Sequence, residues 1–139
     1  MTPDEKQNLL LGQLLDKDKR YSREAYEFVL NAVNVLCGKR REDGAKGKDA
    51  HLSGKQLSEG MRDLLLARFG CMAIDVLEHW GIRSTADFGN IVYNLIGVSL
   101  LSASSEDRQD DFLDVYDFQE EFVKPFFLQK RVKPLPVLL

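Results

Sequence analysis

The sequence of 139 residues lacks the marks of a membrane protein or an exported protein. Its longest uncharged apolar stretch, near residues 88–101, contains asparagine, glycine and serine, and it falls short of the about 20 apolar residues that span a bilayer. The first five residues include Asp4 and Glu5 and no basic residue, whereas a signal peptide begins with basic residues followed by an apolar run. We therefore expect no contact with membranes and a cytoplasmic location.

Cysteine is scarce. Cys37 and Cys71 stand 34 positions apart, a spacing that no metal-binding knuckle has, and in the cytosol such a pair is normally two reduced, buried thiols. The remaining composition, 44% hydrophobic and 29% charged, is ordinary for a globular protein. It excludes wholesale disorder, collagen and a disulfide scaffold, and the length fits one domain with an adequate core.

The motifs of the common enzyme classes are missing. There is no G-x-S-x-G motif, and the stretch Gly44–Lys48 lacks the spacing of a phosphate-binding loop. Neither His51 nor His79 has a recognisable catalytic partner. We predict no catalytic residue, no cofactor-binding residue and no cofactor, and nothing in the sequence indicates an enzyme.

Two groups of residues bear on metal binding. Asp75, Glu78 and His79 follow one another at helical spacing, with Cys71 one turn earlier, and such a set can hold a divalent metal. No second ligand cluster supports it, and a histidine near the end of a helix is also stabilised by the helix dipole. The acidic stretch Asp107–Asp117 lacks the glycine and the closing glutamate of an EF-hand loop. We predict no metal-ligating residue.

Apolar residues at helical spacing, bounded by capping residues and glycines, predict a series of helices over residues 1–97. Thr2 and Ser53 are predicted N-caps, Gly38 is predicted to end the second helix, and Gly81 is predicted to end the fourth with Ile82 packed beyond it. The predicted helices are Asp4–Leu15, Ser22–Leu36, Ser53–Phe69, Met72–Trp80 and Ser84–Gly97.

The period of the apolar residues changes after Gly97. From Phe112 to Phe118 apolar and acidic residues alternate, which is the strand signal, although a helix through residues 118–122 is an alternative. We predict a mainly α fold with a small β-hairpin. Residues 52–122 would form a winged-helix-like core within a single domain, residues 1–123. The helices Asp4–Leu15 and Ser22–Leu36 would pack on this core as an N-terminal pair.

In a winged-helix protein the helix Ser84–Gly97 would occupy the recognition position. Its predicted exposed face carries Thr85, Asp87, Asn90 and Asn94 and has no lysine or arginine. The predicted wing, residues 104–111, is acidic, and nucleic-acid binding depends largely on basic contacts to phosphate. We therefore expect no DNA binding through this surface.

Charge is unevenly distributed along the chain. Residues 98–123 carry eight acidic residues and one basic residue, a net charge of −7, whereas residues 124–139 carry four basic residues and none that is acidic. This C-terminal tail contains Pro125, Pro134 and Pro136, so we expect it to be extended. Its apolar residues cannot form a core of their own and must pack on the same domain or dock on another chain, for instance at the edge of the predicted hairpin.

These features predict a non-catalytic protein-interaction or structural domain. The tail would mediate homo-oligomer formation, and the acidic loop at 105–117 would suit a basic protein partner. The alternative is a nucleic-acid-binding, winged-helix-like protein, although a basic stretch such as Lys39–Lys48 is more often a solvated loop. That alternative would use the basic residues Lys39, Arg40, Arg41, Lys46, Lys48, Lys130, Arg131 and Lys133.

Several short runs between residues 51 and 118 also resemble a known family. They are His51–Leu57, Gly60–Arg62, Phe69-Gly70, Met72-Ala73, Trp80–Thr85, Asp87–Gly89, Tyr93–Leu95, Asp111-Phe112 and Asp114–Phe118. Together they are similar to a family of small uncharacterised bacterial proteins with no assigned activity, over most of residues 20–122. The resemblance implies no catalytic residue, cofactor or substrate.

Overall fold

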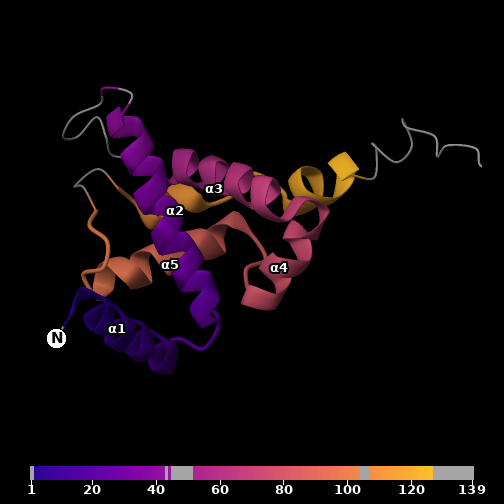
Figure 1. The fold of residues 1–139 in the computed structure, drawn as a ribbon. Helices are drawn as coiled ribbons and strands as arrows, with labels where there is room; N and C mark the ends of the chain where they lie inside the picture. Colours follow the sequence, from indigo (N-terminus) through magenta and orange to yellow (C-terminus); the bar gives the residue numbers. More distant parts are fainter. Residues whose placement is uncertain (1, 43, 45–51, 104–106, 127–139) are drawn as a thin grey trace, which may run out of the picture.

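The structure is a computed structural model, and it describes residues 2–42, 44, 52–103 and 107–126. This part of the chain is helical throughout and contains no strand (Figure 1). Its α-helices are α1 (Pro3–Lys17), α2 (Arg23–Glu42), α3 (Gly54–Phe69), α4 (Ala73–Trp80) and α5 (Thr85–Gly97). Shorter helical turns are η2 (Gly70–Met72), η3 (Gln109–Phe112) and η4 (Gln119–Val123), the last of which is a π-helical turn.

The predicted capping residues at the starts of the helices are confirmed. The Thr2 hydroxyl accepts a hydrogen bond from the Glu5 amide at 3.2 Å. Ser53 and Gln56 form a reciprocal capping box, in which each side chain accepts a hydrogen bond from the other's backbone amide. Such caps satisfy amides that have no partner within the helix, and each is worth about 1 kcal/mol.

Gly81 ends α4 as the sequence predicts. Its φ of 86° is left-handed, its amide bonds to the Glu78 carbonyl, and the Ile82 amide bonds back to the Leu77 carbonyl at 2.9 Å. This is the Schellman arrangement, and Ile82 is buried beyond it. A Cβ atom on Gly81 would also overlap the backbone carbonyl of Arg20. The close approach of the α1–α2 loop is therefore a second reason, besides the left-handed φ, why position 81 requires glycine.

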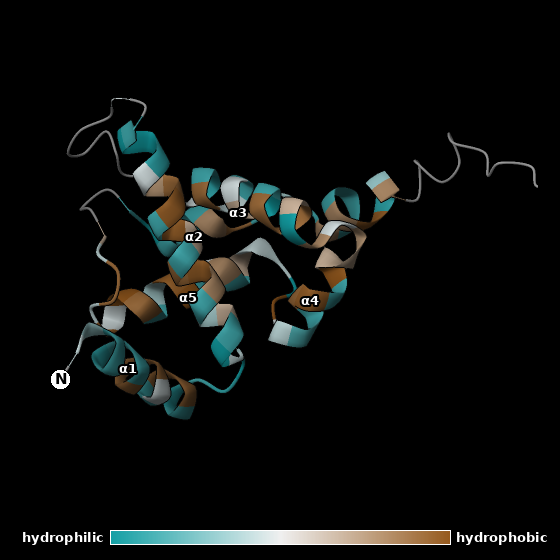
Figure 2. Cartoon of the chain, viewed as in Figure 1, coloured by the Kyte–Doolittle hydropathy of each residue, from teal (hydrophilic) through white to brown (hydrophobic). Residues whose placement is uncertain are grey.

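The predicted end of the second helix at Gly38 is wrong, because α2 continues through this glycine to Glu42. Glycine inside a helix costs only about 1 kcal/mol relative to alanine. The basic residues Lys39, Arg40 and Arg41 occupy the last turn of α2, where the helix dipole favours positive charge. This exposed end of α2 is hydrophilic in Figure 2.

α2 is the central helix of the fold. The prediction that α1 and α2 pack as an N-terminal pair on a core formed by residues 52–122 is therefore wrong. α2 contacts α1, α3, α4 and α5, and it crosses α5 in Figure 1. One buried cluster joins side chains from α1 to the helical turn at Phe122. Its largest fully buried members are Tyr26, Phe88, Phe122, Leu11, Met61, Leu65, Leu77, Ile82, Ile91 and Leu95.

The predicted β-hairpin and winged-helix core are also wrong. Phe112 lies in the turn η3 and packs against Gly54 and Gly89, where a Cβ atom would come within 3 Å of its ring. Asp114 has a left-handed φ of 49°, which is incompatible with a strand. Phe118 and Phe122 stand four residues apart, which is a helical spacing, and both are buried on a helical turn. The alternative of a helix over residues 118–122 is thus the correct one.

Candidate functional site

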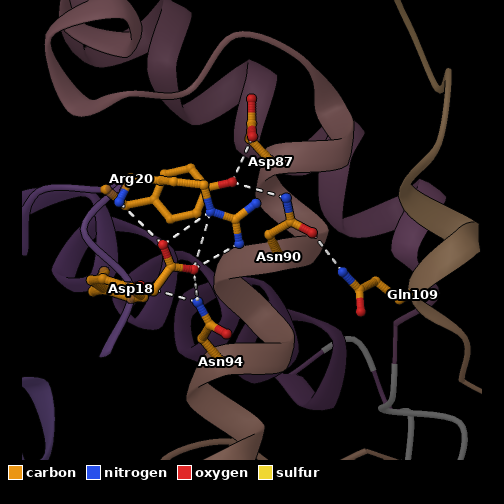
Figure 3. A network of polar contacts seen from close by, with 8 residues as sticks. Asp18, Arg20, Asp87, Asn90, Asn94 and Gln109 are labelled. Carbon is orange, nitrogen blue, oxygen red and sulfur yellow. Dashed lines mark hydrogen bonds and ion pairs between the residues drawn. The ribbon is translucent and has the colours of Figure 1, made fainter. Parts of the chain in front are cut away.

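A network of polar side chains covers the face of α5 that the sequence predicts to be exposed (Figure 3). Asp87, Asn90 and Asn94 on α5 follow one another at helical spacing and meet residues of the α1–α2 loop and the start of α2. We call this set the α5 polar network. Its members are Asp18, Arg20, Tyr21, Tyr26, Asp87, Asn90, Asn94 and Gln109.

Asp18 is the hub of one half of the network. Its carboxylate accepts hydrogen bonds from the Arg20 guanidinium at 2.7 Å and from the Asn94 side-chain amide at 3.0 Å. The Asn94 amide also donates to the Tyr26 hydroxyl at 3.1 Å. The hydrogen bonds from Arg20, followed by the bond from Asn94, hold the pKa of Asp18 well below its usual range.

Tyr21 is the hub of the other half. Its hydroxyl donates to the Asp87 carboxylate at 2.5 Å and accepts from the Asn90 amide at 2.9 Å. The Asn90 carbonyl in turn accepts from Gln109, the first residue of the turn η3. Burial, and then the hydrogen bond to Asp87, raise the pKa of Tyr21 above its usual range, so the phenol stays protonated.

Few polar groups of α5 remain available to contact a nucleic acid, because the chain's own residues bind them. The second oxygen of Asp87 is occupied by the backbone amides of Arg83 and Ser84. Thr85, predicted to be exposed, is only 1% exposed, and its hydroxyl accepts a hydrogen bond from the Val115 amide. The prediction that this face is exposed is wrong, because residues far away in the sequence bind to it.

A cavity beside Tyr93 is too small to be a ligand site. It lies between α2, α3, α5 and η3, and its volume of about 40 Å³ compares with about 300–1,000 Å³ for ligand pockets. The Tyr93 hydroxyl is the one buried side-chain polar atom without a hydrogen-bond partner in the part of the chain that the structure describes. A space of this size suits a few water molecules, which would satisfy the hydroxyl. Burial and the charges of Asp107 and Asp111 raise the pKa of Tyr93.

A larger concave surface lies between α2 and α3. We call it the α2/α3 groove, and its volume is about 330 Å³. Val35 lines it and is 55% exposed, so the groove presents apolar surface to solvent. The residues that line the groove are Phe28, Asn31, Ala32, Val35, Leu64, Ala67 and Arg68.

The groove exists because both helices carry a wider apolar stripe than the core covers. Phe28, Ala32 and Val35 lie at i, i+4 and i+7 on α2, so they share one face, but only Phe28 and Ala32 are buried. On α3, Leu64 is half-buried and Ala67 is exposed on the side that faces α2. The sequence carried one signal of this groove: Val35 is an apolar residue that continues the helical spacing of Phe28 and Ala32.

A third surface is acidic and lies between α4 and η4. It has a volume of about 470 Å³ and brings Asp75 and Glu78 of α4 next to Asp117, with Arg83 at the same groove. We call it the α4/η4 groove. Ile74, Ile82 and Phe118 provide its apolar walls. The negative charge of the segment 98–123 thus contributes to a concave surface that also draws on α4.

The residues weighed as metal ligands do not come together. Asp75 and Glu78 line the α4/η4 groove, whereas His79 and Cys71 are exposed residues that do not line it. Within the described ranges no group of three or more His, Cys, Asp or Glu side chains could hold a metal ion. Cys37 is half-buried and Cys71 exposed, and both are free thiols, so the expectation that both are buried is wrong for Cys71.

The basic residues predicted for nucleic-acid binding are only partly covered by the structure. Lys39, Arg40 and Arg41 occupy the last turn of α2, where they also stabilise the helix end. Lys46, Lys48, Lys130, Arg131 and Lys133 lie outside the described residues, as do His51 and residues 104–106 of the predicted wing.

No protein-family model, curated protein or solved structure matches this chain. The resemblance to a small bacterial family therefore stays a prediction. None of the helices in the described ranges is long and apolar enough to cross a membrane.

Proposed function

We propose that this protein is a non-catalytic protein-interaction domain whose binding surface is the α2/α3 groove. The observation that carries the proposal is Val35, an apolar side chain that is half exposed in a groove of about 330 Å³. Exposed apolar surface in a concave site favours binding of another apolar segment, because burial removes that surface from water.

The composition of the groove indicates what it would bind. Phe28, Val35 and Leu64 offer apolar contacts, whereas Asn31 and Arg68 offer hydrogen-bond donors at the same surface. Grooves between two helices commonly take an apolar face of a peptide, which is anchored by a few side chains. We propose such a peptide segment as the ligand class.

The other surfaces support this choice by contrast. The side chains of the α5 polar network hydrogen-bond to one another, and the cavity beside Tyr93 is too small for a ligand. The α4/η4 groove suits the basic protein partner predicted from the acidic segment, because Asp75, Glu78 and Asp117 would attract positive charge. That partner stays a prediction, as does a cytoplasmic location.

The test is affinity capture with the full chain immobilised. The wild type is compared with Val35→Asp, which places a charge in the groove, and with Leu9→Asp as a matched control. Leu9 is 52% exposed on α1 and does not line the groove. We expect partners that the wild type and Leu9→Asp capture equally and that Val35→Asp loses. The same set of captured proteins on all three chains would contradict the proposal.

A further inference from the structure

We infer that the α2/α3 groove binds a short amphipathic helix whose apolar stripe ends in a carboxylate side chain. This inference rests on the proposed function, because it gives the chemistry of the peptide that the same groove would bind. Residues 127–139 of the predicted docking tail lie outside the described residues, so the role of the tail in homo-oligomer formation stays a prediction.

The two helices that form the groove run antiparallel. Leu36, in the second half of α2, packs on Gly60, in the first half of α3, where a Cβ atom would lie 2.6 Å from the Leu36 side chain. At the other end of the groove Phe28 and Phe69 both contact Trp80, with ring centroids at 5.3 Å and 6.0 Å. The end of α3 therefore lies beside Phe28.

The walls of the groove offer no backbone partner to an extended peptide. Both walls are α-helices, whose interior amides and carbonyls bond to one another, and the described residues contain no strand edge. The polar side chains of the lining are only those of Asn31 and Arg68. An extended peptide would bury amides and carbonyls without partners, whereas a helix satisfies these groups internally. The groove therefore favours a helical ligand.

The length of the groove sets the spacing of apolar residues in this ligand. From Phe28 to Val35 α2 rises about 10 Å, which is two helical turns. A helix lying alongside would place apolar side chains at i, i+4 and i+7 over the same distance. These side chains would cover Val35 and remove its exposed surface from water.

Arg68 supplies the charge that the ligand would meet. It is the one charged residue among the described residues that line the groove. Its guanidinium lies over the Phe69 ring and has no ion pair within the described ranges. On α2 the adjoining turns carry Glu24 at one end of the groove and Lys39 at the other, so these flanks add no net charge. The lining is therefore positive.

A carboxylate is the natural complement of Arg68, because guanidinium and carboxylate match as donors and acceptors. Asp63, one turn before Ala67 on α3, does not line the groove and is paired with Arg62 at 3.1 Å. Arg68 lies at the Phe28 end of the groove, since the end of α3 is there. The start of a helix favours negative charge, so we expect the carboxylate in the first turn of the ligand, which then runs parallel to α2.

The experiment is a selection from a displayed library of random peptides of about 16 residues, long enough for four helical turns. The full chain is the bait, and Val35→Asp is used to remove peptides that bind elsewhere. We expect the enriched sequences to carry apolar residues at helical spacing, preceded by aspartate or glutamate. Binding to the wild type should raise their helical signal in circular dichroism.

Synthetic copies of the enriched peptides are then measured by fluorescence anisotropy against the wild type, the control Leu9→Asp and Arg68→Glu. We expect Leu9→Asp to bind like the wild type. Arg68→Glu should bind about five- to tenfold more weakly, because repulsion replaces attraction at an exposed position. A peptide in which the acidic residue is changed to lysine should reverse this order. Circular dichroism verifies that each protein variant is folded.

Two results would overturn the inference alone. They are enriched peptides that bind without gaining helix, and acidic peptides that bind Arg68→Glu as tightly as the wild type. In both cases binding still depends on Val35, so the proposed function stands with a different peptide chemistry. If no peptide is enriched after the removal step with Val35→Asp, the groove is not a peptide site, and both the inference and the proposed function are wrong.

Discussion

The two outer sides of the helical core end in different ways. Over α5, polar side chains from the α1–α2 loop bind to Asp87, Asn90 and Asn94 through hydrogen bonds with defined partners. Between α2 and α3, apolar side chains extend to solvent, and Val35 has no comparable cover among the described residues. The side over α5 is covered by side chains of the same chain, so we expect substitutions there to destabilise the fold. The side between α2 and α3 leaves room for another segment.

The largest loss of stability is expected when a member of the α5 polar network is removed. Tyr21→Ala deletes a buried ring together with the hydroxyl that joins Asp87 to Asn90. We expect the free energy of unfolding to fall by about 3–5 kcal/mol, as for other buried aromatic side chains. Urea unfolding measures it, with Val35→Ala as the control on the open side. Equal losses in the two variants would contradict the contrast.

A milder change separates the hydrogen bonds from the packing. Tyr21→Phe keeps the ring but leaves the Asn90 amide and one oxygen of Asp87 without this partner. The expected loss is about 1–2 kcal/mol, because partly buried polar groups would remain unsatisfied. The same urea experiment measures it, and a value within error of zero would show that the network fills space without contributing through its hydrogen bonds.

The acid side of the pH profile tests Asp18. Because Arg20 and Asn94 lower its folded-state pKa, its contribution is present above the unfolded pKa of about 3.9 and is lost as the pH falls toward the folded value. We expect Asp18→Asn to be about 1 kcal/mol less stable than the wild type at pH 6, since Arg20 is largely exposed. The difference should shrink between pH 4 and pH 2 in thermal unfolding. A gap that stays constant over that range would rule out the ion pair as its source.

The smallest effect is expected on the open side. Val35→Asp should change the free energy of unfolding by about 1 kcal/mol or less, because the side chain is already half exposed. Thermal unfolding next to Leu9→Asp gives the comparison. A loss of the size expected for Tyr21→Ala would show that Val35 belongs to the core after all.

The local signals in the sequence predicted most of the helices correctly. Ser53 with Gln56, and Gly81 with Ile82, act within a few residues of one another, so their geometry follows from the sequence alone. The alternation from Phe112 to Phe118 was misleading because it is short. One left-handed residue, Asp114, breaks it, and the helical interval between Phe118 and Phe122 competes with it.

The two sides of the core could not be predicted in the same way. The partners that the α1–α2 loop and α2 provide for α5 lie 66–76 positions away in the chain, as in the pairs Tyr21 with Asp87 and Asp18 with Asn94. Periodicity shows that a face is polar, but it does not show which loop will bind there. For the same reason it did not show that the apolar stripes of α2 and α3 diverge and leave a groove.

The contact between Gly81 and the backbone of Arg20 has a consequence for synthesis on the ribosome. The loop at residues 18–22 packs against the end of α4 and the side of α5, so its partners are added only from Trp80, which accepts from the Ser22 amide, to Asn94, which donates to Asp18. Until then α1 is joined only to α2, and two helices alone bury little. The loop that follows the first helix to be made therefore waits for the fourth and fifth helices before it gains these neighbours.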